Sequence, residues 1–265
     1  MIIDSHCHII ESRYEKPISE IIDICEAGNI DLLLNIATKE PEFNEILSIS
    51  EKYKQIYNSV GIHPHETENL DQNVFSKIDE IIKKNKKTIA VGETGLDFYY
   101  NHSNKKDQIL SFEKHIETAL QHKLPIIVHS RNAEKETKEI LYSYKKSSDL
   151  SGVIHCFTGS KQFARDMMNI DFYISFSGII TFKNSSLLRE VVSIVEKNKI
   201  LVETDSPFLA PVPKRGKTNI PAYIIHTIEQ IADILDINVH EVKQITSNNF
   251  FKLFERVEDT QFKIY

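Results

Sequence analysis

The chain opens with Met1-Ile-Ile-Asp-Ser-His-Cys-His8, a short apolar run that ends in two histidines. The run has no room for a helix, so we interpret it as a β-strand. Side chains alternate between the two faces of a strand, so His6 and His8 should lie on one face and Cys7 on the other. Neutral imidazole is the commonest metal ligand in proteins. The stretch therefore predicts a first strand with part of a metal site at its end, and the other ligands must come from elsewhere in the chain.

Seven further apolar runs follow the first, at intervals of about 20 to 37 residues, which is the room that one strand, one helix and two loops need. The eight runs are centred near Ile3, Leu33, Val60, Ala90, Ile127, Ile154, Ile174 and Val202. Helical patterns lie between them: residues 105–122 place apolar side chains at three- and four-residue steps, and another such pattern follows Pro221. Strands that alternate with helices in this way predict parallel βα units.

This alternation predicts an α/β fold, a closed (β/α)8 TIM barrel in a single domain over residues 1–265, with a C-terminal tail at about 256–265. An open doubly wound sheet is the alternative, but it usually has fewer strands and a glycine-rich first turn, which is absent here. Composition agrees with a globular protein, at 41% hydrophobic and 26% charged residues. We find neither a signal peptide nor a membrane-spanning run, and the three cysteines form no Cys-x-x-Cys pair, so we expect a cytoplasmic protein with no membrane partner.

Six of the eight runs end at, or within two residues of, a potential metal ligand. The ligands are His6 and His8, His63, Glu93, His129, His155 and Asp205. In a (β/α)8 barrel the active site lies at the carboxyl ends of the strands, so residues remote in sequence converge there. The formal net charge of -6 argues against general nucleic-acid coating, yet it leaves room for a local basic rim around an acidic, metal-filled pocket.

Six motifs, in order along the chain, resemble the TatD family of metal-dependent deoxyribonucleases, within the amidohydrolase superfamily. They are Asp4-Ser-His-Cys-His8, Gly61-Ile-His-Pro-His65, Gly92-Glu-Thr-Gly-Leu-Asp97, Val128-His-Ser-Arg131, His155-Cys-Phe-Thr-Gly159 and Glu203-Thr-Asp-Ser-Pro-Phe208. Each motif alone is weak, whereas six in register from residue 4 to about residue 254 are specific. The resemblance implies a hydrolase that acts on phosphodiesters.

The resemblance also implies the metal ligands. His6, His8 and Asp205 would hold one divalent cation, His129 and His155 would hold a second, and Glu93 would bridge the two. Such a pair activates a water as hydroxide near neutral pH and neutralises the charge that develops on a phosphodiester. We assign Glu93 and Asp205 the catalytic roles, with Asp205 as proton acceptor from that water. The ligand types suit zinc or manganese, and nucleases commonly use magnesium, so the metal stays open among Mg, Zn and Mn.

A pocketed centre of this kind accepts a strand end more easily than a duplex interior, so we expect a monomeric 3′→5′ exonuclease on single-stranded DNA ends. Candidate substrate contacts are His63, Arg131, Lys183 and Arg215. Two interpretations of His63 are possible: a contact to the substrate phosphate or a simple loop contact. Tyr99 and Tyr100 likewise either stack on a base or pack against the protein. The family usually reads Arg-Asn-Glu-Pro where this chain has Thr218-Asn-Ile-Pro221, which removes one guanidinium and one carboxylate and bears on substrate recognition.

Two other functions compete with this prediction. One is a different amidohydrolase-type activity, such as a deaminase, a lactonase or a small phosphoesterase. Many two-metal members of that group bridge their ions with a modified lysine, whereas the fourth run here offers Glu93. The other is a non-catalytic binding protein, which is disfavoured because all six metal ligands are present.

Overall fold

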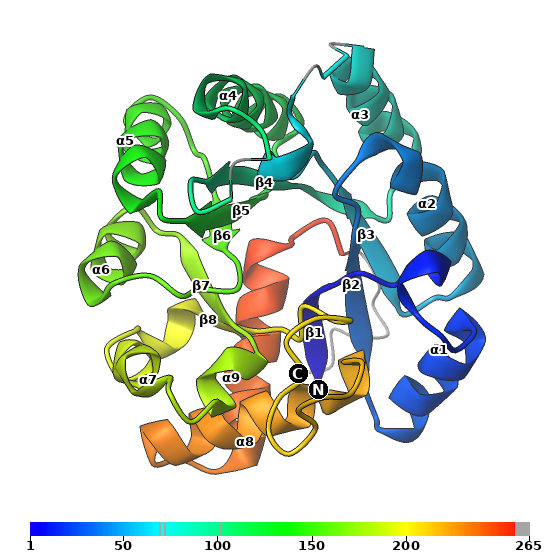
Figure 1. Cartoon of the computed structure of the whole chain (residues 1–265), viewed down its shortest axis with the longest axis vertical. Coiled ribbons are helices and arrows are strands. Elements are labelled where there is room, and N and C mark those ends of the chain that lie inside the picture. The colour runs from blue at the N-terminus through cyan, green and yellow to red at the C-terminus, as the bar shows by residue number, and fades with distance from the viewer. Residues whose placement is uncertain (69, 72, 101, 258–265) are drawn as a thin grey trace.

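The computed structural model describes residues 1–68, 70–71, 73–100 and 102–257. Eight parallel strands lie side by side in chain order and curl into a barrel with helices around it (Figure 1). The strands are β1 (Ile3–Cys7), β2 (Leu32–Ile36), β3 (Ile56–Val60), β4 (Thr88–Asp97), β5 (Ile126–Arg131), β6 (Gly152–Ile154), β7 (Tyr173–Phe176) and β8 (Ile200–Val202). Each contains or adjoins one of the predicted apolar runs.

Hydrogen bonds between the β1 segment and the segment that begins at the end of β8 close the ring. The backbone N–H of Asp205 donates to the carbonyl of His6 at 2.9 Å, and that of His8 donates to the carbonyl of Ser206 at 2.8 Å. Below them, the Ser5 hydroxyl donates to the carbonyl of Val202 at 2.8 Å. The predicted (β/α)8 barrel is therefore confirmed, and the open doubly wound sheet is excluded.

In the part of the chain that the structure describes, eight outer helices follow the predicted alternation (Figure 1). They are α1 (Ile18–Ala27), α2 (Phe43–Lys52), α3 (Asn73–Lys84), α4 (Lys105–His122), α5 (Glu134–Lys145), α6 (Lys161–Asn169), α7 (Ser186–Val192) and α8 (Ile224–Leu235). A ninth, α9 (Val239–Leu253), follows α8 directly. The helix predicted over 105–122 has the bounds of α4 in the structure. It begins there because the side chain of Asn104 accepts the N–H of Asp107, which satisfies a free donor of the first turn.

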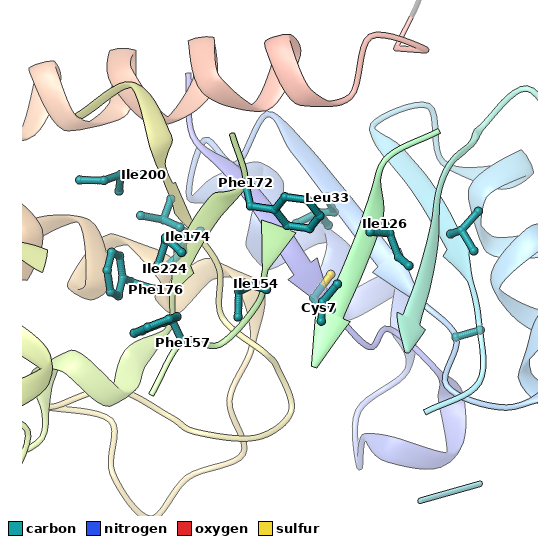
Figure 2. Packing of buried hydrophobic residues seen from close by; sticks show 14 of the residues in the cluster. Cys7, Leu33, Ile126, Ile154, Phe157, Phe172, Ile174, Phe176, Ile200 and Ile224 are labelled. Atoms are coloured by element: carbon teal, nitrogen blue, oxygen red, sulfur yellow. The ribbon is translucent and has the colours of Figure 1, made fainter. Parts of the chain in front are cut away.

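The apolar interior forms two shells, because successive strand residues face opposite ways. Leu33 faces outward and packs with the surrounding helices, in the shell that Figure 2 shows. Leu32 and Leu34 face the barrel interior, which is closed at its amino-terminal end by Phe250 and Phe254 at the end of α9. This packed floor leaves the carboxyl ends of the strands as the place for a site.

Two further findings concern the helices and the tail. None of the helices in the described ranges is long and apolar enough to cross a membrane. Of the predicted C-terminal tail at about 256–265, Arg256 donates to the carbonyls of Thr88 and Ile82, and Val257 is buried. Residues 258–265 lie outside the described residues.

Candidate metal centre

The first strand delivers the two histidines with which the chain begins. His6 and His8 are buried, and their Nε2 atoms lie 3.3 Å apart. Between them, Cys7 faces the other way, into the outer shell, with its thiol 3.4 Å from the carbonyl of Leu34. The strand alternation thus brings both imidazoles to one point, as predicted for a pair of metal ligands.

Glu93 from β4 lies at the centre of the histidines. Its Oε2 is 3.3 Å from Nε2 of His6, while its Oε1 is 2.8 Å from Nε2 of His155 and 3.1 Å from Nδ1 of His129. One carboxylate oxygen therefore faces the β1 histidine, and the other faces histidines from β5 and the end of β6.

Asp205 completes the cluster from the loop after β8. Its Oδ1 is 3.3 Å from Nε2 of His8 and 3.8 Å from Nε2 of His6. The side chain of Asp205 is 14% exposed, compared with 4% for Glu93. Asp205 is therefore the carboxylate of the cluster that solvent reaches more readily.

The carboxylates and imidazoles of the cluster favour one another's charged forms. Burial would raise the pKa of the Glu93 carboxyl, but His155 and His63 hold that pKa well below its usual range. Burial would likewise lower the pKa of His155, yet the charges of Glu93 and Glu203 hold it well above 6.5. Such paired shifts mark a dense array of opposite charges, which is typical of functional sites.

The donor set fits divalent cations. His6, His8 and Glu93 offer ligand atoms that all lie within 4.8 Å of one another, and so do His63, Glu93 and His129. Imidazole nitrogen with carboxylate oxygen is the chemistry that zinc, manganese and iron accept. The second group contains His63, which the sequence placed among substrate contacts, and its Nε2 is 3.4 Å from Oε1 of Glu93.

A cavity of about 750 Å³ opens above this cluster. His8, Glu93, His129, His155 and Asp205 line it, together with the candidate substrate contacts His63 and Arg131. The other two candidates lie apart from that lining. Lys183 is exposed just beyond the loop of Ile179, and Arg215 places its guanidinium 4.0 Å from the centre of the Phe182 ring.

The departure from the family pattern lies beside the Asp205 loop. Thr218 is exposed and Ile220 joins the outer shell of the core. Between them, buried Asn219 donates its amide to the carbonyls of Thr204 and Phe208, at 2.9 and 2.6 Å. Asn219 therefore holds the loop that carries Asp205, whereas its two neighbours place no charge near the cavity.

Two carboxylates behind the cluster were quoted in motifs but given no role by the sequence. Glu203 is fully buried; its Oε1 accepts the N–H of Cys156 at 2.6 Å and lies 3.5 Å from Nδ1 of His155. Its carboxylate is also within 4.8 Å of a ring nitrogen of His6, whose ring stacks on His155 with centroids 3.9 Å apart. The i, i+2 spacing of Glu203 and Asp205 after a strand is the signal that could have found it.

Asp97 is the second such carboxylate, at the end of β4. Its Oδ2 lies 3.0 Å from Nε2 of His65 and 3.1 Å from Nε2 of His129. Asp97 in turn accepts the backbone N–H groups of Tyr99 and Tyr100. A carboxylate on the far nitrogen of a ligand imidazole orients that ring, which is the usual arrangement around protein metals.

A parallel barrel with histidines and carboxylates gathered at the carboxyl ends of its strands is the architecture expected of a metal-dependent hydrolase. Comparison with known proteins then gives the family. A model of the TatD related DNase family matches residues 3–255. An uncharacterized metal-dependent hydrolase of Buchnera aphidicola is 39% identical over 262 residues, which cover 96% of this chain and 98% of that protein. The chain belongs to the TatD family of metal-dependent hydrolases.

Two further relatives agree with this assignment. YcfH, an uncharacterized metal-dependent hydrolase of Escherichia coli, is 37% identical over 258 residues, which cover 96% of this chain and 95% of that protein. The crystal structure of the TatD homologue YjjV, also from Escherichia coli, matches with a TM-score of 0.88 at 24% identity, over 96% of this chain and 98% of that chain. The latter likeness supports the fold.

Proposed function

We propose that the protein is a deoxyribonuclease that removes nucleotides from the 3′ ends of single-stranded DNA, with two divalent cations held by the histidine cluster. The observation that carries this proposal is the position of Glu93, whose two carboxylate oxygens face different histidines. A shared carboxylate offsets the repulsion between two cations. When bound, the cations supply Lewis acidity toward a phosphoryl oxygen and acidify a water molecule.

The roles of the side chains follow from their places. His6, His8 and Asp205 would hold one cation, His129 and His155 the other, and Glu93 both. Asp205 would also accept the proton of the attacking water, because it is the more exposed carboxylate of the cluster. We propose magnesium, zinc or manganese as the native metal.

The cavity supports the substrate class. Its volume of about 750 Å³ suits a strand end, and Arg131 and His63 in its lining can contact phosphates. The family name, TatD related DNase, points to the same substrate. We propose Lys183 and Arg215 as contacts for a strand that continues beyond the cavity, and we propose that one monomer carries the complete site.

The test is a time course on 3′-labelled and 5′-labelled single-stranded DNA, with magnesium, manganese or zinc and with a chelator. We expect metal-dependent release of 3′ mononucleotides, its loss in Glu93→Ala, and its retention in Glu190→Ala, which removes an exposed carboxylate on α7. Release that survives in Glu93→Ala would refute the proposal. Turnover of small lactones, amides or bases at rates that match DNA would instead favour another amidohydrolase activity.

A further inference from the structure

Exposed aromatic rings lie on two opposite sides of the cavity mouth. Tyr99 and Tyr100, just after β4, are 55% and 41% exposed, and Phe208, in the loop after β8, is 52% exposed. In a ring of eight strands in chain order, β4 and β8 are diametrically opposite. Tyr100 and Phe208 both line the cavity, with the histidine cluster between them.

Each side also carries an arginine. The Arg131 guanidinium lies 4.1 Å from the centre of the Tyr99 ring and 4.7 Å from that of Tyr100. Across the mouth, the Arg13 guanidinium lies 5.9 Å from the centre of the Phe208 ring. We call Tyr99, Tyr100 and Arg131 the tyrosine platform, and Phe208 with Arg13 the phenylalanine platform.

Both platforms are held in place from below. The Tyr100 ring stacks on His102, with centroids 5.5 Å apart and 24° between the planes, and meets His65 edge to face. Arg13 donates to Glu42 at 2.6 Å and to Thr38 at 3.0 Å, which fixes it beside the cavity. The Tyr100 ring and the Arg13 guanidinium are therefore preorganised, and binding to them loses little side-chain entropy.

We propose that the two platforms bind two unpaired bases of one DNA strand, one on each side of the phosphodiester that lies over the metal centre. This inference rests on the proposed function and adds to it that the protein contacts the bases on both sides of the cleaved phosphodiester. Aromatic faces stack on any base, and guanidinium groups hold phosphates, so recognition is tolerant of sequence. A guanidinium beside each ring matches a strand that carries one phosphate for every base.

The first test measures binding without hydrolysis. Metal-loaded protein is titrated against a fluorescent hexathymidylate with phosphorothioate linkages, which resists cleavage. Tyr99→Ala/Tyr100→Ala and Phe208→Leu should each weaken binding by about 5- to 150-fold, as expected for the loss of one stacked base. Leu187→Ala, which trims an exposed apolar residue of α7 away from the cavity lining, should bind within twofold of the wild type.

The second test locates each base. A single abasic nucleoside is moved along the hexathymidylate, and two positions should weaken wild-type binding. The double tyrosine variant should lose its sensitivity at one of these positions, and Phe208→Leu at the other. Both variants binding like the wild type, or both losing sensitivity at the same position, would overturn the two-platform proposal. Failure of the wild type to cleave an unmodified hexathymidylate would refute the proposed function instead. Binding is measured separately, on the cleavage-resistant strand, so the two failures can be told apart.

Discussion

A single buried carboxylate, Glu203, lies against two stacked imidazoles whose Nε2 atoms both face Glu93. A carboxylate is an acceptor only, so beside Nδ1 of His155, at 3.5 Å, it favours hydrogen on that nitrogen. This arrangement leaves the Nε2 lone pair of His155 free for a metal. Glu203 therefore acts on the candidate metal centre through the ring of His155, on which His6 stacks.

We expect Glu203→Gln to weaken metal binding by about 10- to 100-fold, the usual cost of losing a partner behind a metal ligand. The amide keeps one acceptor oxygen for the N–H of Cys156 but places a donor against a ring nitrogen. Chelator competition measures the affinity, and ¹⁵N spectra of the histidines in zinc-loaded protein report the tautomers. Glu196→Gln, on an exposed loop, is the matched control. Unchanged affinity and unchanged tautomers would contradict this role.

Among the elements, β4 and β5 approach so closely that a side chain does not fit between them at Gly95. A Cβ at this position would lie 2.1 Å from the carbonyl oxygen of His129, and its φ of +131° strains any other residue. We expect Gly95→Ala to cost about 2–4 kcal/mol of unfolding free energy, from backbone strain and overpacking together. Urea unfolding measures the loss.

The control for this prediction is Gly216→Ala. Gly216 also has positive φ, at +81°, but a Cβ there meets open space. Gly216→Ala should cost about 1 kcal/mol of unfolding free energy, because it adds backbone strain without overpacking. Equal losses of unfolding free energy in the two variants would mean that overpacking against β5 adds nothing to the cost of Gly95→Ala.

A buried histidine on α4 fixes the loop that carries His63. His115 accepts the N–H of Ile62 on Nε2 at 3.0 Å and donates from Nδ1 to the carbonyl of Ser111 at 2.7 Å. Burial lowers the pKa of His115 to about 4. The folded protein therefore keeps this ring neutral down to about pH 4, whereas the unfolded chain protonates it below its ordinary pKa of 6.5.

Stability must then fall as the pH drops from about 6.5 to about 4, because the unfolded state binds the extra proton. The full contribution of His115 is about 3 kcal/mol, since one pKa unit is worth about 1.4 kcal/mol. Comparing wild type with His115→Gln in urea unfolding at pH 7 and pH 4.5 isolates this term, because both proteins share the other titrating groups. If His115→Gln lost as much stability between pH 7 and pH 4.5 as the wild type, the assigned role of His115 would be wrong.

These elements also show what a sequence can and cannot predict. The periodic runs predicted the eight strands and the bounds of the helix over 105–122, because local patterns and strand-end positions decide both. Of the six residues proposed as ligands, His6 lies 3.3 Å from Glu93 without lining the cavity, and the other five line it: His8, Glu93, His129, His155 and Asp205. Two long-range contacts were not predicted: His115 accepts the N–H of Ile62, 53 residues away, and Arg215 lies over the Phe182 ring. Such contacts depend on how helices pack on the barrel, which no local pattern contains.

On the scale of the whole molecule, the metal centre and the closure of the barrel depend on the same segments. Where the ring closes, the N–H of Asp205 donates to the carbonyl of His6, and the N–H of His8 donates to that of Ser206. The side chains of Asp205 and His8 also face each other, at 3.3 Å. Glu93, His129 and His155 come from β4, β5 and the end of β6, elsewhere around the ring. Bound cations would thus join strands that are remote in sequence and absent as a site from the unfolded chain.

We therefore expect metal to stabilise the fold as well as to serve catalysis. A ligand at about a thousandfold excess over its Kd adds roughly 4 kcal/mol when it binds only the folded state. For a chain of this size that corresponds to a rise in Tm of roughly 8–16 °C. Differential scanning calorimetry of chelated and metal-loaded protein measures the rise. Glu93→Ala should show a much smaller one, because the ligand common to both groups of histidines is gone. An equal rise in the two proteins would mean that the stabilising metal binds elsewhere.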